Sequence, residues 1–141
     1  MRLAMWLMVL VGCGSNLTST NQNTDGELVD ETDVDPPEIV HDPVVETMPF
    51  GEDVAILATV TDADSGILFV YLHYKNETGG AADWQDVIMT ASGDDYSGTI
   101  QGSRMQGGGV YYYIEAIDKA TNPSFAPDEG LDDPYHFRLA D

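Results

Sequence analysis

Two acidic stretches of the chain carry side chains that could bind a metal ion. Asp62 and Asp64 lie in the run Thr-Asp-Ala-Asp-Ser-Gly, and Asp118 and Asn122 lie in the run Asp-Lys-Ala-Thr-Asn. Ca²⁺ takes about six to eight oxygen ligands from carboxylates, amides and carbonyls, which is what these side chains offer. The alternative is that they only form turns, because Asp and Asn side chains bond to their own backbone there. A calcium site therefore requires a fold that brings the two stretches together.

Aromatic side chains form a second candidate group. Trp84 could serve as a platform on which a sugar ring stacks, joined by Tyr71, Tyr111 and Tyr113 on one outward face. The alternative is that Trp84 covers the edge of the core and that the tyrosines are ordinary cross-strand pairs on a sheet surface. A ligand surface on these four residues is the more specific of the two expectations, and the structural role of the same residues remains the alternative.

Catalytic motifs are missing from the sequence. No serine lies in Gly-x-Ser-x-Gly, and no His-Glu-x-x-His motif or cysteine pair offers a zinc site. The three glycines 107–109 lack the Lys-Ser/Thr pair of a phosphate loop, so a tight turn is the better explanation. We therefore expect no enzymatic activity, and we expect His41, His73 and His136 not to share a metal ion.

The charge of the chain excludes one class of partner. The 141 residues include 25 acidic and 5 basic side chains, which gives a formal net charge of −20. A nucleic-acid partner is excluded because phosphates need a Lys/Arg surface. The same charge suits a self-repelling exterior and divalent cations.

The first residues have the pattern of an export signal. Arg2 precedes an apolar run over residues 3–11, which as a helix would span about half of a hydrocarbon core. Leu10-Val11-Gly12-Cys13 resembles the lipobox of bacterial lipoproteins. That resemblance implies cleavage after residue 12, a diacylglyceryl group on Cys13, and an anchor in the cell envelope. Because Gly14 follows, it also implies the outer rather than the inner membrane.

A polar tether separates this anchor from the folded part. Residues 14–35 are rich in Ser, Thr, Asn, Asp and Glu and contain no aromatic residue. Such a segment buries too little apolar surface to offset the entropy of ordering, so residues 13–35 are expected to be a disordered acidic spacer. Pro36-Pro37 then opens one domain over residues 36–141.

The domain is expected to be all-β. Short runs of alternating apolar and polar residues recur, separated by Gly, Asp, Asn and Pro. About seven such strands in a domain of this length predict a single antiparallel two-sheet sandwich of the immunoglobulin or fibronectin type III kind. The expected strands are residues 39–46, 54–61, 68–75, 84–90, 96–100, 110–118 and 135–139. In three of them the alternation predicts the inward-facing side chains: Val54, Ile56, Ala58 and Val60; Val70, Leu72 and Tyr74; and Val110, Tyr112, Ile114 and Ala116.

The domain resembles the Ig-like repeats of secreted bacterial proteins. The resemblance lies in Val-Thr-Asp-Ala-Asp-Ser-Gly-Ile at 60–67 and in Tyr-Tyr-Ile-Glu-Ala-Ile-Asp at 112–118. Where fibronectin-type domains carry a tyrosine, this chain has Val110, so Tyr111 or Tyr113 would have to replace it. In such a sandwich the turns at 62–66 and 118–122 meet at one end, where Asp35 also arrives. The resemblance thus implies that the calcium candidates share one end of the domain, where the turn-forming alternative also stays open and where Lys119 counts against a metal.

These observations predict an exported lipoprotein that presents a non-catalytic Ig-like binding or structural module. Two alternatives remain open, a carbohydrate-binding module and an adhesion-type module made rigid by calcium. The expected partners are the membrane, through the lipid anchor, and a protein or glycan surface. No cofactor is expected except Ca²⁺.

Overall fold

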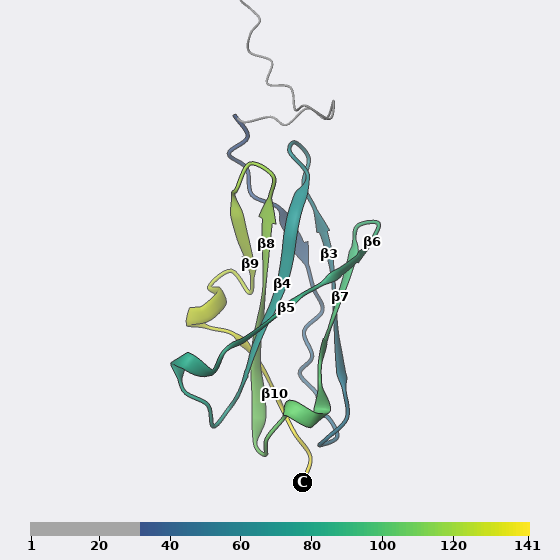
Figure 1. The fold of residues 1–141 in the computed structure, drawn as a ribbon, viewed down its shortest axis with the longest axis vertical. Helices are drawn as coiled ribbons and strands as arrows, with labels where there is room; N and C mark the ends of the chain where they lie inside the picture. The colour runs from purple at the N-terminus through teal and green to yellow at the C-terminus, as the bar shows by residue number, and fades with distance from the viewer. Residues whose placement is uncertain (1–31) are drawn as a thin grey trace, which may run out of the picture.

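The computed structural model describes residues 32–141 of the chain. The predicted signal peptide, the predicted lipidation site Cys13 and most of the predicted tether lie outside the described residues. The described chain is all-β, and two antiparallel sheets pack face to face (Figure 1). The predicted sandwich class is confirmed, and the reason is the sequence alternation that gives each sheet one apolar face.

Each sheet joins strands that are distant in the sequence. The four strands of the first sheet lie in the order β2 (Glu38–Val40), β3 (Val54–Thr61), β7 (Asp95–Ile100), β6 (Thr90–Ser92). The second sheet has the order β10 (Tyr135–Arg138), β8 (Gly109–Asp118), β4 (Ile67–Asn76), β5 (Gln85–Ile88), with β9 (Pro123–Ala126) also paired to β8. Three short 3₁₀ turns complete the described chain: η2 (Ala81–Asp83), η3 (Gly102–Arg104) and η4 (Gly130–Asp132).

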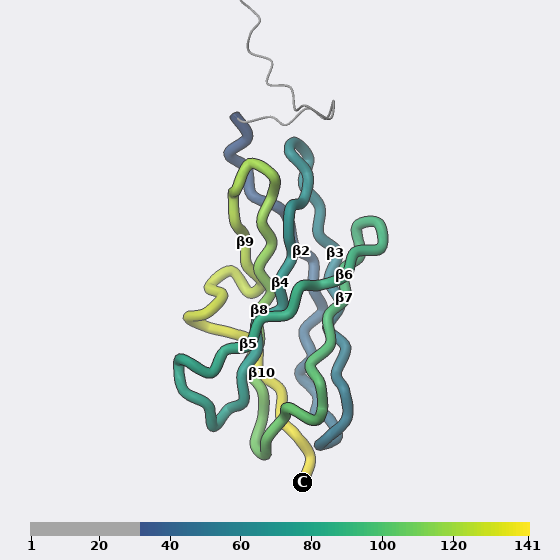
Figure 2. Tube along the Cα trace, viewed as in Figure 1, coloured from purple at the N-terminus to yellow at the C-terminus, as the bar shows by residue number. Residues whose placement is uncertain are grey.

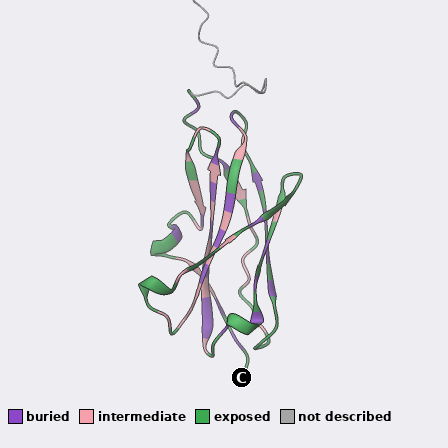
Figure 3. Ribbon diagram, viewed as in Figure 1, coloured by how far each residue is buried: buried purple, intermediate pink, exposed green. Residues whose placement is uncertain are grey.

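The core lies between the inner faces of the sheets (Figure 3). Along β3 buried and exposed residues alternate strictly, as the period of a strand requires. The residues predicted to face inward are buried, and this confirms the expected faces of three strands. They are Val54, Ile56, Ala58 and Val60 of β3, Val70, Leu72 and Tyr74 of β4, and Val110, Tyr112, Ile114 and Ala116 of β8.

Three strand predictions need correction. The first strand ends at Val40 instead of residue 46, since Pro43 has no N–H for a ladder. The strand expected at 84–90 is divided, because the chain crosses at Met89 from the second sheet to the first. Strand β9 lies where only a turn was expected, at 122–133. The described chain therefore has nine strands instead of about seven.

The expected replacement for the family tyrosine is also wrong. Tyr111 and Tyr113 lie on the outer face of β8, half-buried, while Tyr112 is fully buried. The Tyr112 hydroxyl accepts a hydrogen bond of 2.8 Å from the backbone N–H of Val44. Tyr112 is thus the tyrosine that ties β8 to the segment between β2 and β3.

The sandwich has two distinct ends. Residues 32–36 and the β3–β4 and β8–β9 turns lie together at the end nearest the tether (Figures 1 and 2). The β4–β5 connection and η3 lie at the opposite end. Between residues 32 and 141, no helix is long and apolar enough to cross a bilayer.

Candidate functional site

The β3–β4 turn is organised by the carboxylate of Asp62. Its Oδ1 accepts the backbone N–H groups of Asp64 at 3.0 Å and of Gly66 at 2.8 Å. Gly66 has φ +85°, a conformation that glycine adopts without strain. The turn-forming interpretation of Asp62 is therefore correct, but both of these hydrogen bonds use the same oxygen.

The β8–β9 turn is organised in the same way by Asp118, which is fully buried. Its Oδ1 accepts the backbone N–H of Asn122 at 2.7 Å, and its Oδ2 accepts the Asn122 side-chain amide at 2.9 Å. A backbone hydrogen bond of 2.8 Å from Lys119 N to the carbonyl of Gly66 joins this turn to the β3–β4 turn. The two predicted stretches are thus brought together.

Asp33 completes the cluster, although the sequence placed it in the tether. The Asn122 side-chain amide donates a hydrogen bond of 3.0 Å to the Asp33 backbone carbonyl and so fastens this residue to the sandwich. Asp33 is only 8% exposed. Its Oδ1 accepts the N–H of Asp35 at 2.9 Å, whereas its buried Oδ2 has no hydrogen-bond partner.

Five carboxylates form two overlapping groups at this end. One oxygen each from Asp33, Asp62 and Asp118 lies within 4.8 Å of the other two, and the same holds for Asp33, Asp35 and Asp64. Two unit charges about 5 Å apart repel by about 3 kcal/mol where the effective dielectric constant is near 20. A hollow of about 300 Å³ beside the cluster is lined by Asp35, Pro36, Glu38, Thr61, Asp62, Ala63 and Asp64. The arrangement concentrates negative charge with room for water beside it.

The predicted ligands therefore divide into three kinds. Asp62 and Asp118 belong to the inner group, and Asp64 belongs to the outer, exposed group. Asn122 turns its NH₂ group toward the cluster, so it positions Asp118 and Asp33 instead of offering an oxygen. The residue that the sequence analysis missed is Asp33, because nothing in its polar neighbours indicates burial.

The predicted aromatic residues lie along one face, on which His73 stacks against Tyr113 at 4.5 Å and separates Tyr71 from Trp84. The Trp84 and Tyr113 rings meet edge to face at 5.2 Å, and Lys75 Nζ lies 5.3 Å from the centre of the Trp84 ring and 5.8 Å from that of Tyr111. Tyr71 instead packs against Phe69 and His73 farther along the same face. A hollow of about 450 Å³ at this surface is lined by Lys75, Ala81, Trp84, Tyr111, Leu131 and Pro134.

The three histidines are engaged in separate places. His73 lies between two carboxylates, with Nδ1 2.7 Å from Asp86 and Nε2 2.9 Å from Glu115. His136 Nε2 lies 3.1 Å from a Glu77 carboxylate oxygen. His41 contacts the carbonyl of Leu57 and the hydroxyl of Tyr112. Each histidine thus has its own set of partners, and none of these partners is shared with another histidine.

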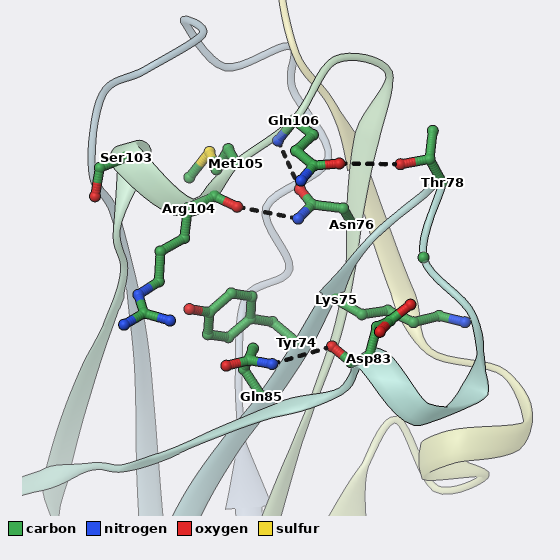
Figure 4. A pocket seen from close by; sticks show the side chains of 11 residues that line it. Tyr74, Lys75, Asn76, Thr78, Asp83, Gln85, Ser103, Arg104, Met105 and Gln106 are labelled. Carbon is green, nitrogen blue, oxygen red and sulfur yellow. Dashed lines mark hydrogen bonds between the residues drawn. The ribbon is translucent and has the colours of Figure 1, made fainter.

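A polar hollow of about 450 Å³ lies at the end away from the tether (Figure 4). Asn76 holds its wall, because Oδ1 accepts the N–H of Gln106 at 2.7 Å and Nδ2 donates to the carbonyl of Arg104 at 3.0 Å. Burial raises the pKa of Tyr74, which lines the hollow, while the charge of Arg104 acts in the opposite direction. Arg104 and Lys75 place two of the chain's five basic residues around this hollow.

Comparison with known proteins adds no assignment: no family model matches the chain, and no curated protein matches it either.

Proposed function

We propose that this protein is an exported, lipid-anchored module that holds a non-catalytic β-sandwich away from a membrane and presents its far end to a partner. The observation that carries the proposal is the separation of two features. Residues 32–36 lie at one end of the sandwich, and the polar hollow around Asn76 and Arg104 lies at the other (Figures 1 and 4).

The length of the strands sets this separation. Strand β4 runs from Ile67 near the tether to Asn76 at the hollow, and its ten residues span about 30 Å at roughly 3.3 Å per residue. A lipid on Cys13 and a polar spacer would add to that distance. The far end would therefore be the part of the domain that first meets another surface.

The chemistry of the hollow suits binding. Its walls carry the guanidinium of Arg104 and the amides of Gln85 and Gln106, together with the carboxylate of Asp83, on a chain whose net charge is −20. Both polar atoms of the Asn76 side chain are already bonded to the η3 loop. The guanidinium and the two glutamine amides orient a polar ligand by hydrogen bonds and admit a carboxylate where the rest of the surface would repel it. The non-catalytic part of the proposal is supported by the contacts of the histidines, since His73 lies between two carboxylates and His41 contacts a tyrosine and a carbonyl.

Replacement of the lipidated cysteine tests the anchor. We expect the full chain to fractionate with membranes and the Cys13→Ser variant to be released into the soluble fraction. Ser15→Ala, two residues further on, is the matched control and should leave the protein in the membrane. A processed Cys13→Ser protein that stays with the membranes would contradict the proposal.

A second candidate function is the binding of a neutral polysaccharide at the hollow beside Trp84. It is favoured by one observation, namely that Trp84 and Tyr111 line the same hollow. Sugar rings stack on such aromatic faces, whereas an acidic polysaccharide would be repelled by the net charge.

Tryptophan fluorescence tests this second candidate. Removal of the signal peptide would take Trp6 with it, so Trp84 would be the only tryptophan left. Soluble neutral polysaccharides should quench its emission, Tyr111→Ala should weaken that effect, and Tyr71→Ala should not. Trp84→Ala should abolish retardation in gels that contain the polysaccharide. Unchanged retardation would exclude this surface as the sugar site.

A further inference from the structure

We propose that Asp33, Asp62 and Asp118 bind one Ca²⁺ ion, and that this ion fastens the end of the tether to the sandwich. The three carboxylates come from three separate segments, namely the chain before β2, the β3–β4 turn and the end of β8. This proposal concerns the opposite end of the domain from the polar hollow. It stands or falls independently of the proposed function.

The spacing of the oxygens fits a single ion. Two ligands bound to one Ca²⁺ at about 2.4 Å can be at most about 4.8 Å apart. The contributing oxygens of Asp33, Asp62 and Asp118 all lie within 4.8 Å of one another. The spacing of the three oxygens is therefore compatible with one shared ion.

The buried oxygen of Asp33 is an independent sign of a ligand. Asp33 is 8% exposed, and its Oδ2 is buried without a hydrogen-bond partner. A buried carboxylate oxygen with no partner is costly, and such groups are normally paired or bind a metal. Asp33 belongs to both carboxylate groups, so its side chain is directed into the cluster.

The donor set points to calcium. The two groups contain only carboxylates, with no imidazole or thiolate that would favour zinc. The exposed Asp35 and Asp64 and water in the neighbouring hollow can complete a shell of about six to eight oxygens. The buried and half-buried aspartates of the inner group supply negative charge, and the exposed outer group gives the ion access from solvent.

The ion would change how firmly residues 32–35 are held against the sandwich. With Ca²⁺ bound, Asp33 is attracted to the two turns. Without it, the Asp33 carboxylate faces Asp62 and Asp118, while the Asn122 hydrogen bond holds the Asp33 backbone. Calcium would thus set the direction in which the tether leaves the sandwich, and with it the orientation of the far end.

Lys119 is the rival counter-ion, because it follows Asp118 directly in the same turn. If its ammonium group took the place of a metal, calcium would bind only after that charge was removed. The Lys119→Met variant separates the two possibilities. It should bind Ca²⁺ at least as tightly as the unaltered chain if the metal is the counter-ion.

The experiment uses the full chain, with Ca²⁺ itself as the probe. Thermal melts in millimolar CaCl₂ and in EGTA should differ by roughly 10 °C at a hundredfold excess over Kd. Asp33→Asn should lose most of this shift, yet it should still fold because Asn keeps the size of the side chain. Asp132→Asn, an exposed change in η4, is the matched control and should keep the full shift.

Hydrogen exchange tests the docking of the tether separately from stability. The Asp35 N–H, which donates to Asp33, should exchange slowly in CaCl₂ and rapidly in EGTA, whereas the exposed Gln106 N–H, bonded to Asn76 at the opposite end, should exchange at the same rate in both. The proposal is overturned if a folded chain shows no shift in CaCl₂. It is also overturned if Asp33→Asn keeps the full shift, or if only Lys119→Met responds to calcium.

Discussion

The hydroxyl of Tyr112 donates a hydrogen bond of 2.9 Å to Nε2 of His41, and this contact connects the two sheets. His41 Nδ1 donates to the carbonyl of Leu57 at 2.6 Å, and because burial lowers the pKa of His41 the imidazole is neutral at pH 7 and Nε2 is its accepting nitrogen. The Tyr112 oxygen in turn accepts the N–H of Val44. The network is complete only while His41 is neutral.

Acid should therefore destabilise the sandwich through His41. Burial lowers the pKa of His41 below its ordinary value of 6.5, although the Leu57 carbonyl and Asp42 act in the opposite direction. The unfolded chain then binds more protons than the folded chain between the lowered pKa and 6.5. Stability from neutral His41 is fully present above pH 6.5 and is lost as the pH falls through that window.

Urea unfolding at a series of pH values measures this effect. His41→Gln should reduce the dependence of the unfolding free energy on pH in this window, whatever its effect at neutral pH. His73→Gln is the control, since His73 lies on the outer face between Asp86 and Glu115 and does not take part in this network. An unchanged slope in His41→Gln would assign the acid sensitivity to another group.

Removal of the Tyr112 hydroxyl should cost stability without changing the shape of the core. Tyr112→Phe leaves Nε2 of His41 and the N–H of Val44 without their partner, and one such buried group costs about 1–3 kcal/mol. Tyr111→Phe, one residue earlier on the outer face, should change the unfolding free energy by less than about 0.5 kcal/mol. Chemical denaturation at pH 8 compares them, and equal losses would contradict the bridging role.

The Tyr112 phenol should also resist ionisation. Burial raises its pKa to about 12, against the opposing hydrogen bond from Val44. In an ultraviolet titration of the folded chain, one tyrosine should therefore ionise well after exposed ones, and the late step should be absent from Tyr112→Phe. A late step that persists in that variant would belong to a different tyrosine.

The long strands could be predicted because the alternation of residue types that forms them is visible in the local sequence. In β3 every second residue is apolar, and the same alternation in β4 and β8 decided which side chains are buried. Strand β9 could not be predicted in this way. It begins at Pro123 and becomes a strand because Ile114–Ile117 of β8 offers a partner, which is a property of the tertiary structure.

The residues of the candidate metal site also fall into those that could be predicted from the local sequence and one that could not. Asp62 and Asp118 could be selected because aspartates close to a turn mark strand ends, and the sandwich predicted that the two turns meet. Asp33 could not be selected, because its burial depends on a hydrogen bond to Asn122, 89 residues away. Asn122 was selected as a ligand from its place in the turn, but the direction of its amide depends on the neighbours that the fold supplies.

Gly102 should not tolerate a side chain. A Cβ at this position would overlap the backbone carbonyl of Gly51, and the Gly102 N–H donates to Asp53 at 2.8 Å in the same contact. We expect Gly102→Ala to destabilise the domain by about 3 kcal/mol or more, since backbone must move to admit it. Gly107→Ala, which meets nothing within 4 Å, should be nearly neutral. Similar melting temperatures for the two variants would disprove this close packing.

Asn76 should control the wall of the polar hollow more than the stability of the whole sandwich. Asn76→Ala removes the acceptor of the Gln106 N–H and the donor to the Arg104 carbonyl. We therefore expect the Gln106 amide to exchange with solvent much faster, with a loss of about 1–2 kcal/mol in the unfolding free energy.

Asn76→Asp keeps the acceptor, so the Gln106 amide should stay protected although the Arg104 carbonyl loses its donor. Gln85→Ala is the control, because this side chain lines the same hollow but bonds only to the backbone of Asp83 and Trp84. If the Gln106 amide exchanged equally fast in all three variants, the wall would be held by something other than Asn76.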